Sequence, residues 1–152
     1  MAYIERKTGN KCPFCNNSDH NKKSSDLTVI RGQHAYVLMN LYPYNGGHLL
    51  VLPYRHIKDI SEVSKHEFAE ITKFLQQGVA ALKHALNADG FNIGSNLGSV
   101  AGAGIPDHIH FHIVPRWKGD TNFMPVVGET KVMPESLDDT KARLIECWPQ
   151  EN

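Results

Sequence analysis

Three histidines occupy alternate positions, His108, His110 and His112, and the residues between them, Ile109 and Phe111, are apolar. This alternation has the period of a β-strand, in which successive side chains point to opposite faces of a sheet. We therefore expect the three imidazoles to share one face while the apolar side chains pack into a core. A row of imidazoles suits metal binding, or proton and group transfer near neutral pH. A merely solvent-facing strand would use Thr, Lys or Glu as readily, so that explanation is disfavoured.

The middle histidine, His110, is the candidate nucleophile of the row. A neutral imidazole can attack phosphorus to give a covalent phosphoramidate, which a second nucleophile then resolves. Gly102 and Gly104, just before the row, allow backbone N–H groups to converge on an anion such as phosphate. An ordinary flexible turn is the alternative for these glycines. Their proximity to the histidines favours phosphate chemistry.

Cys12 and Cys15 form a second chemical feature, a pair with two residues between them in a polar, turn-rich segment that we expect to be a loop (residues 11–25). The chain has three cysteines, and an odd count argues against a disulfide framework. The pair therefore predicts a metal or redox role in a reducing compartment, and the absence of a surrounding βαβ pattern weakens the redox role. A reduced pair without metal is the simpler alternative. Cys147 is typical of a small buried apolar residue.

Length and composition favour a single globular domain. The chain has 152 residues, of which 41% are hydrophobic and 21% charged, and 16 basic residues balance 16 acidic ones. The formal net charge of zero argues against broad electrostatic binding to nucleic acid. No apolar run reaches membrane-spanning length, and the first residues lack the apolar core of a signal peptide. We therefore expect a cytoplasmic protein with no membrane partner.

Short strands are expected in the first third of the chain, where apolar runs alternate with turn signals. Two strands, at 27–31 and 35–40, flank a hairpin turn at 32–33. A third strand at 48–52 is apolar enough to be buried on both faces, and Pro53 ends it.

One long helix follows, beginning at Ser64 and Glu67, which have the spacing of a capping box. The residues after them place an apolar side chain every three or four positions, as on one face of a helix. This stripe consists of Phe68, Ile71, Leu75, Val79, Leu82 and Leu86. Residues 87–90 end the helix, with Gly90 as a turn residue.

A strand at 91–96, the histidine strand and a short helix at 136–147 complete the expected elements. Their order, with mostly short connections, predicts an α+β domain with an antiparallel sheet of about five strands, one long helix and a short C-terminal helix.

Residues 108–114 match the His-φ-His-φ-His-φ-φ signature, where φ is apolar, and the chain resembles the histidine triad family of nucleotide hydrolases and transferases. Residues 40–56 are similar to the nucleotide-binding strand and turn of that family, and residues 90–98 to the strand before its phosphate loop. Residues 115–123 resemble the branch that contains bacterial diadenosine tetraphosphate phosphorylases.

The resemblance covers most of the chain and implies the HIT-like fold in one domain, residues 1–152. Within it we expect a Cys-x-x-Cys knuckle at 11–25, a core at 26–117 and a C-terminal extension at 118–152. It also implies a homodimer whose two sheets join, with the long helix near the interface. Intramolecular packing explains the apolar stripe of the helix equally well.

The resemblance assigns roles to individual residues. His110 corresponds to the nucleophile that attacks an α-phosphorus and carries a nucleotidyl group, usually AMP. His112 would contact the phosphate and orient His110, and His48 corresponds to a further histidine near the catalytic strand. Together with His108 these residues form the expected catalytic set. The nucleotide-binding positions would be Asn40, Leu41, Asn96, Gly102, Ala103, Gly104, His110 and His112. A turn cap for Asn40 and a hydrogen-bonded core position for His48 are the alternatives.

A structural zinc site is also implied by the resemblance. Its ligands would be Cys12, Cys15, His56 and His108. Two thiolates and two imidazoles suit tetrahedral zinc. His20 and His34 are rival ligands that the sequence leaves open.

One segment departs from the pattern of the family. Many members carry Ser or Thr just before the triad, whereas residues 104–107 contain no hydroxyl. This departure bears on the preferred substrate more than on the reaction class.

The sequence therefore predicts a nucleotidyl hydrolase or transferase that acts on a small AMP-containing substrate, a dinucleoside polyphosphate such as diadenosine tetraphosphate. Phosphate or water would be the second nucleophile, and magnesium is an optional companion of the polyphosphate. The alternatives are a nucleotide-binding or sensing module with little turnover and a nucleoside phosphoramidate hydrolase. A zinc-knuckle nucleic-acid module is disfavoured by the neutral charge.

Overall fold

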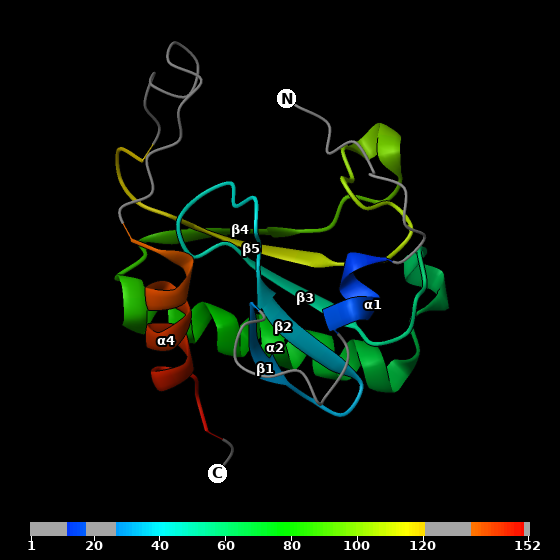
Figure 1. The fold of residues 1–152 in the computed structure, drawn as a ribbon, viewed down its shortest axis with the longest axis horizontal. Helices are drawn as coiled ribbons and strands as arrows, with labels where there is room; N and C mark the ends of the chain where they lie inside the picture. Colours follow the sequence, from blue (N-terminus) through cyan, green and yellow to red (C-terminus); the bar gives the residue numbers. More distant parts are fainter. Residues whose placement is uncertain (1–11, 18–26, 121–134, 151–152) are drawn as a thin grey trace.

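One antiparallel sheet of five strands organises the computed structural model, which describes residues 12–17, 27–120 and 135–150. The strand order across the sheet is β1-β2-β3-β5-β4 (Figure 1). The strands are β1 (Thr28–Arg31), β2 (Ala35–Met39), β3 (Leu49–Pro53), β4 (Gly90–Gly94) and β5 (Phe111–Arg116). These elements confirm the predicted α+β class with five antiparallel strands.

The helix α2 (Lys65–Leu86) covers one face of the sheet, and it begins with the predicted capping box of Ser64 and Glu67. Its predicted stripe is confirmed in part, because Ile71 and Leu82 are fully buried and Leu75, Val79 and Leu86 are partly buried against the core. The buried apolar residues, which face the sheet and α4, are Ile71, Phe74, Gly78, Ala81, Leu82 and Ala85. The side chain of Phe68 is 40% exposed. Gly78 lies close to the sheet, because a Cβ there would lie 2.6 Å from Ile113 Cδ1.

The end of α2 corrects the expected role of Gly90. The helix ends at the C-cap Asn87, whose φ of 50° is left-handed. Asn tolerates this region better than most residues, so it replaces the glycine that commonly ends a helix. Gly90 is instead the first residue of β4.

Two further helices lie on the sheet. The helix α4 (Leu137–Glu146) has Ser136 as its N-cap and packs on α2 and β1, which confirms the short C-terminal helix. The helix α1 (Pro13–Asn17) carries Cys15. The predicted loop at 11–25 is therefore wrong for residues 13–17, whereas Cys12 precedes the helix, and residues 11 and 18–25 lie outside the described part. Two single turns of 3-10 helix, η1 (Ile60–Glu62) and η2 (Ser99–Ala101), complete the elements.

The two faces of the sheet carry different side chains, as the strand period predicts. Val37, Val51 and Ile113 belong to the large core under α2. On the other face a smaller apolar cluster lies beneath α1. It consists of Phe14, Tyr36, Leu38, Leu50 and Leu52. Every residue of β3 is buried, which confirms the expected burial of this strand on both faces.

The histidine strand starts later than predicted. β5 begins at Phe111, so His108 and His110 precede the strand and only His112 lies within it. β5 pairs with β3 only from Phe111 and with β4 only from His112, and the N–H of Ile109 donates instead to the carbonyl of Ile57 at 2.7 Å.

The three histidines nevertheless lie on the same side of the sheet. The ring of Phe14, on α1, contacts the rings of both His108 and His110, and the rings of His110 and His112 lie 5.0 Å apart. The predicted common face is confirmed. In the described parts of the chain, every helix is too short or too polar to cross a membrane.

Candidate functional site

His110 is held in one protonation state by the backbone. Its Nδ1 lies 2.8 Å from the carbonyl oxygen of His108, and its side chain is buried. A carbonyl only accepts hydrogen bonds, so Nδ1 carries the proton and Nε2 keeps its lone pair. Burial lowers the pKa of His110 and keeps the imidazole neutral. The ring therefore presents an unprotonated nitrogen, as a nucleophile requires.

His48 has the opposite tautomer because of the loop before it. The backbone N–H of Tyr44 donates to its Nδ1 at 2.9 Å, and Asn40 Nδ2 lies 3.3 Å from the same atom. The Oδ1 of Asn40 accepts from the N–H of Tyr42, which identifies Nδ2 as the donor toward His48. The proton of His48 is therefore on Nε2.

His112 accepts a hydrogen bond from this N–H group of His48. Nε2 of His48 donates to Nδ1 of His112 at 2.9 Å, and both side chains are buried. The proton of neutral His112 is then on its Nε2. Burial, with a smaller effect of His110, lowers the pKa of His112 to about 4, so it is uncharged at neutral pH.

The outer nitrogen of His112 has no hydrogen-bond partner within the described part of the chain, although it is buried. A buried N–H without a partner is costly, and such a group in a native fold points to a ligand or ordered water. The rings of His110 and His112 lie 5.0 Å apart, so a ring with a free lone pair neighbours a ring with an N–H donor. This arrangement can attack an electrophile and donate to an oxygen bonded to it.

His108 points its other nitrogen toward the cysteines. Its Nε2 donates to the carbonyl of Pro53 at 3.0 Å, which leaves the lone pair on Nδ1. That Nδ1 lies 3.5 Å from Cys12 Sγ and 3.6 Å from Cys15 Sγ, and Cys15 Sγ lies 3.3 Å from His56 Nδ1. The four predicted ligands therefore form one cluster, whose ligand atoms all lie within 4.8 Å of one another.

We call Cys12, Cys15, His56 and His108 the metal cluster, and its geometry fits a tetrahedral ion. Zinc bonds of about 2.3 Å to sulfur and 2.0 Å to nitrogen place these ligands about 3.5 Å apart around a tetrahedron. The observed S···N separations of 3.3–3.6 Å agree with that value. Burial, and then the neighbouring Cys12, raise the pKa of the Cys15 thiol. A cation at this place would offset both effects.

The rival ligands have different places. His34 lies outside the metal cluster, and its ring stacks on that of His66 at 5.9 Å. His20 lies outside the described residues.

The predicted nucleotide-binding residues are only partly close to the histidines. Asn40 contacts His48, whereas the side chain of Leu41 is 57% exposed. Asn96 donates to the carbonyl of Gly102 at 3.4 Å. The N–H groups of Gly102 and Ala103 donate to carbonyls inside their own loop. In this structure those two amides therefore do not converge on an anion, and the loop is a closed turn.

Two residues near His110 were missed by the sequence reasoning. Ser95 Oγ donates to the carbonyl of His110 at 2.7 Å. The ring centroid of Phe14 lies 5.1 Å from that of His110. The one available signal was Phe14, an aromatic residue in an otherwise polar segment. Ser95 had none, because a single serine at the end of a strand is unremarkable in sequence.

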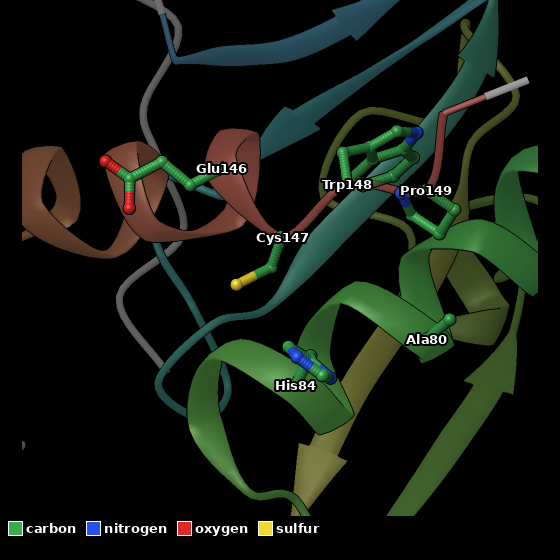
Figure 2. Close-up of a pocket in the computed structure, with 6 residues that line it drawn as sticks. All are labelled: Ala80, His84, Glu146, Cys147, Trp148 and Pro149. Carbon is green, nitrogen blue, oxygen red and sulfur yellow. The ribbon is translucent and has the colours of Figure 1, made fainter.

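A groove between α2 and the end of α4 lies apart from these residues. Figure 2 shows its lining, in which Cys147 lies beside the turn of α2 that carries His84. Cys147 is half-buried and packs against the large core, so the expectation of a small buried apolar residue holds only in part. None of the predicted site residues lines this groove.

Comparison with known proteins agrees with the geometry. The pattern of the HIT domain family matches residues 21–119. A curated protein of Mycobacterium tuberculosis named AP-4-A phosphorylase is 42% identical over 125 residues, which cover 82% of this chain and 64% of that protein. The match therefore spans less than two thirds of its length.

Solved structures show the same architecture. A Zn-bound histidine triad family protein from Mycobacterium smegmatis superposes with a TM-score of 0.73 at 25% identity, over 90% of this chain and 91% of the other. A hypothetical histidine triad nucleotide-binding protein from Sulfolobus tokodaii also gives 0.73, at 26% identity and the same coverage. The family pattern matches more than half of the residues of this chain, and the triad and the fold are those of the family. The chain therefore belongs to the HIT domain family.

Proposed function

We propose that this protein cleaves a dinucleoside polyphosphate by transferring a nucleotidyl group through His110. The observation that carries this proposal is the pair of complementary nitrogens at the site. Nε2 of His110 has a lone pair, and the buried Nε2 of His112 has a proton and no partner among the described residues. The 42% identity to a protein named AP-4-A phosphorylase supports the choice of substrate class.

The reaction would run in two displacements. Nε2 of His110 attacks the α-phosphorus, the P–N bond forms, and the bond to the bridging oxygen breaks, so that a nucleoside polyphosphate leaves with the electron pair. The N–H of His112 donates to a phosphate oxygen that gains charge during this step. Phosphate or water then attacks the same phosphorus, and the P–N bond breaks. His110 is thereby returned to its starting form.

Other proposed contacts surround the phosphate. Asn40 and Leu41 would bind the ribose and the base, and Asn96 would lie near the leaving group. The turn at 102–104 would border the phosphates, and its amides at Gly102 and Ala103 become donors only if the loop opens. Ser95, with a hydroxyl next to the histidines, is not a substitute for the hydroxyl that many family members carry, because it is bonded to the backbone.

A zinc ion held by the metal cluster would serve a structural purpose in this proposal. The ligand types and separations support zinc, as does the Zn-bound relative of the same fold. Closed sites with four protein ligands are structural, whereas catalytic sites keep an open position. Magnesium would enter only with the polyphosphate, and the remaining chemistry belongs to the imidazoles.

We also propose a cytoplasmic homodimer formed through the edge strand β4. β4 is at one end of the sheet, and Ile93 on it is 51% exposed. An exposed edge with apolar side chains can add a second copy of the same strand. Size-exclusion chromatography with light scattering tests this arrangement, and a monomer at micromolar concentration contradicts it.

The functional proposal is tested by product analysis of diadenosine tetraphosphate incubated with the protein, with and without inorganic phosphate. Phosphate-dependent formation of ADP and ATP identifies a phosphorylase. Formation of AMP and ATP without phosphate identifies a hydrolase. Tight AMP binding with no products from this substrate or from nucleoside phosphoramidates contradicts the enzyme and favours a binding module.

A further inference from the structure

Phe14 connects the metal cluster with the nucleophile. Its side chain is 6% exposed, and its ring lies edge-on to His108, with centroids 5.5 Å apart and an interplanar angle of 85°. The same ring lies 5.1 Å from the ring of His110 at 59°. One aromatic side chain therefore touches both a metal-cluster ligand and the histidine that would attack phosphorus.

The position of Phe14 depends on the cluster around it. The sulfurs of Cys12 and Cys15, on either side of it, are within 3.6 Å of His108 Nδ1. Its carbonyl accepts a hydrogen bond of 2.6 Å from the buried hydroxyl of Tyr36. The helix α1 has only five residues, too few to be stable without such contacts. An ion that binds both sulfurs would therefore fix the ring of Phe14 against the histidines.

The ring of His110 needs support of this kind. Its Nδ1–H bond to the backbone fixes the tautomer, and the ring of His112 packs against it at 5.0 Å. Phe14 supplies a second ring contact. Small displacements of a reacting group from its attack geometry lower rates by factors of about 100.

We propose that Phe14 is a positioning residue for His110, and that a metal ion in the cluster affects the chemistry through this ring. The rate effect rests on the proposed function, whereas the effect on the ring of His110 does not. Phe14 is not proposed to touch the reacting atoms.

The first experiment replaces Phe14 by leucine and uses Leu38→Ala as the matched control. Leu38 belongs to the same apolar cluster and is 4% exposed, but it lies on β2, which is separated from β5 by β3. Both variants shorten a buried side chain, so both lose stability. We expect Phe14→Leu to retain bound zinc, to lower kcat by about 10- to 100-fold and to change KM by less than about 3-fold. Leu38→Ala should leave kcat near the wild-type value.

The second measurement does not require turnover. Proton–nitrogen correlation spectra of the imidazoles, with His110 assigned through His110→Asn, report its tautomer and its order. We expect the His110 signals to shift or broaden in Phe14→Leu and to remain as in wild type in Leu38→Ala. If the wild type has no activity and this difference is still observed, the proposed function fails and the positioning role stands. Unchanged His110 signals in Phe14→Leu overturn the positioning role.

Zinc removal and the Phe14→Leu substitution together form a thermodynamic cycle, analogous to a double-mutant cycle. Chelation should shift the His110 signals of the wild type in the same way as Phe14→Leu, and re-addition of zinc should restore them. Because the metal would act through Phe14, chelation of Phe14→Leu should produce little further change. An equal response to chelation in both proteins would overturn the proposed route.

Discussion

Identical side chains have different chemical roles in this site because their hydrogen-bond partners differ. A carbonyl at Nδ1 leaves His110 with a lone pair on Nε2. The amide of Tyr44 donates to Nδ1 of His48, so Nε2 of His48 carries the proton and donates to Nδ1 of His112. The proton of neutral His112 is therefore on its Nε2. The alternation of histidines predicts that they share a face. It does not predict the tautomers, and that of His112 depends on His48 and Tyr44, more than 60 positions earlier in the chain.

A pH dependence of stability follows from His112. Its pKa is lowered to about 4 in the folded protein from the ordinary value of 6.5, mainly by burial. The unfolded chain therefore binds a proton that the folded state rejects, and stability falls as the pH drops from 6.5 toward 4. The slope contributed by one such group reaches about 1.4 kcal/mol per pH unit.

Urea unfolding at a series of pH values tests this dependence. We expect the free energy of unfolding of His112→Gln to fall less steeply between pH 6.5 and pH 4 than that of wild type. Parallel curves for the two proteins would show that His112 does not titrate in this window.

Ser95 offers a second test at the level of one residue. Removal of its hydroxyl leaves the carbonyl of His110 without its 2.7 Å partner. We expect Ser95→Ala to lose about 1 kcal/mol of stability and about 5-fold in kcat, and Ser95→Thr to retain both. The control is Ser99→Ala, in the nearby turn. Kinetics and thermal unfolding of all three check this, and equal losses in the two alanine variants would argue against a specific role of Ser95.

At the scale of elements, the loop between β2 and β3 carries Asn40 and Tyr44, which donate hydrogen bonds to Nδ1 of His48. The structure also explains why the last residue of the loop before His48 is a glycine. Gly47 has a φ of 77°, and a Cβ there would lie 2.5 Å from Leu86 Cδ1. Its neighbour Gly46 has no left-handed φ, and nothing lies within 4 Å of its Cβ position.

Alanine at each glycine should therefore have opposite effects. We expect Gly47→Ala to destabilise the protein by about 1–3 kcal/mol through strain and crowding. Gly46→Ala should be neutral or stabilising by up to about 1 kcal/mol, because it reduces the entropy of the unfolded chain. Thermal unfolding of both variants measures the difference, and similar losses for the two would contradict this view of the loop.

Local signals predicted the elements better than their packing. The capping box at Ser64 depends on residues three positions apart and was confirmed. The apolar stripe was confirmed only in part, since Phe68 is 40% exposed and Phe74, which the predicted stripe did not include, is buried. Which apolar residue faces the sheet depends on the approach of α2, which Gly78 permits. The start of β5 likewise depends on where its pairing with β3 and β4 begins.

At the scale of the whole molecule, the sheet separates stability from chemistry. One face packs against α2 and forms the large core, while the other carries the histidines and the small helix α1. The metal cluster joins residues from three distant segments of the chain. The four ligands were predicted from the family resemblance. Phe14 and Ser95 were not, because their roles follow from contacts with His110 that no local pattern encodes.

Metal removal should therefore lower the thermal stability of the whole domain. An ion bound only to the folded state adds to stability, so chelation should lower Tm by several degrees, and zinc should restore it. Cys15→Ser should reproduce this loss, with reduced metal content. Cys147→Ser is the matched control, because this thiol lies outside the metal cluster, and it should keep both metal and Tm. Equal losses in both variants would contradict the assignment.

The central claim is the covalent intermediate on His110, and mass spectrometry of the acid-free, rapidly denatured reaction with diadenosine tetraphosphate tests it most directly. We predict a mass increase of one adenylyl group on the peptide that contains His110, its disappearance when phosphate or water resolves the intermediate, and its absence in His110→Asn. Turnover by His110→Asn at the wild-type rate, or an adenylyl group on another residue, would contradict the account.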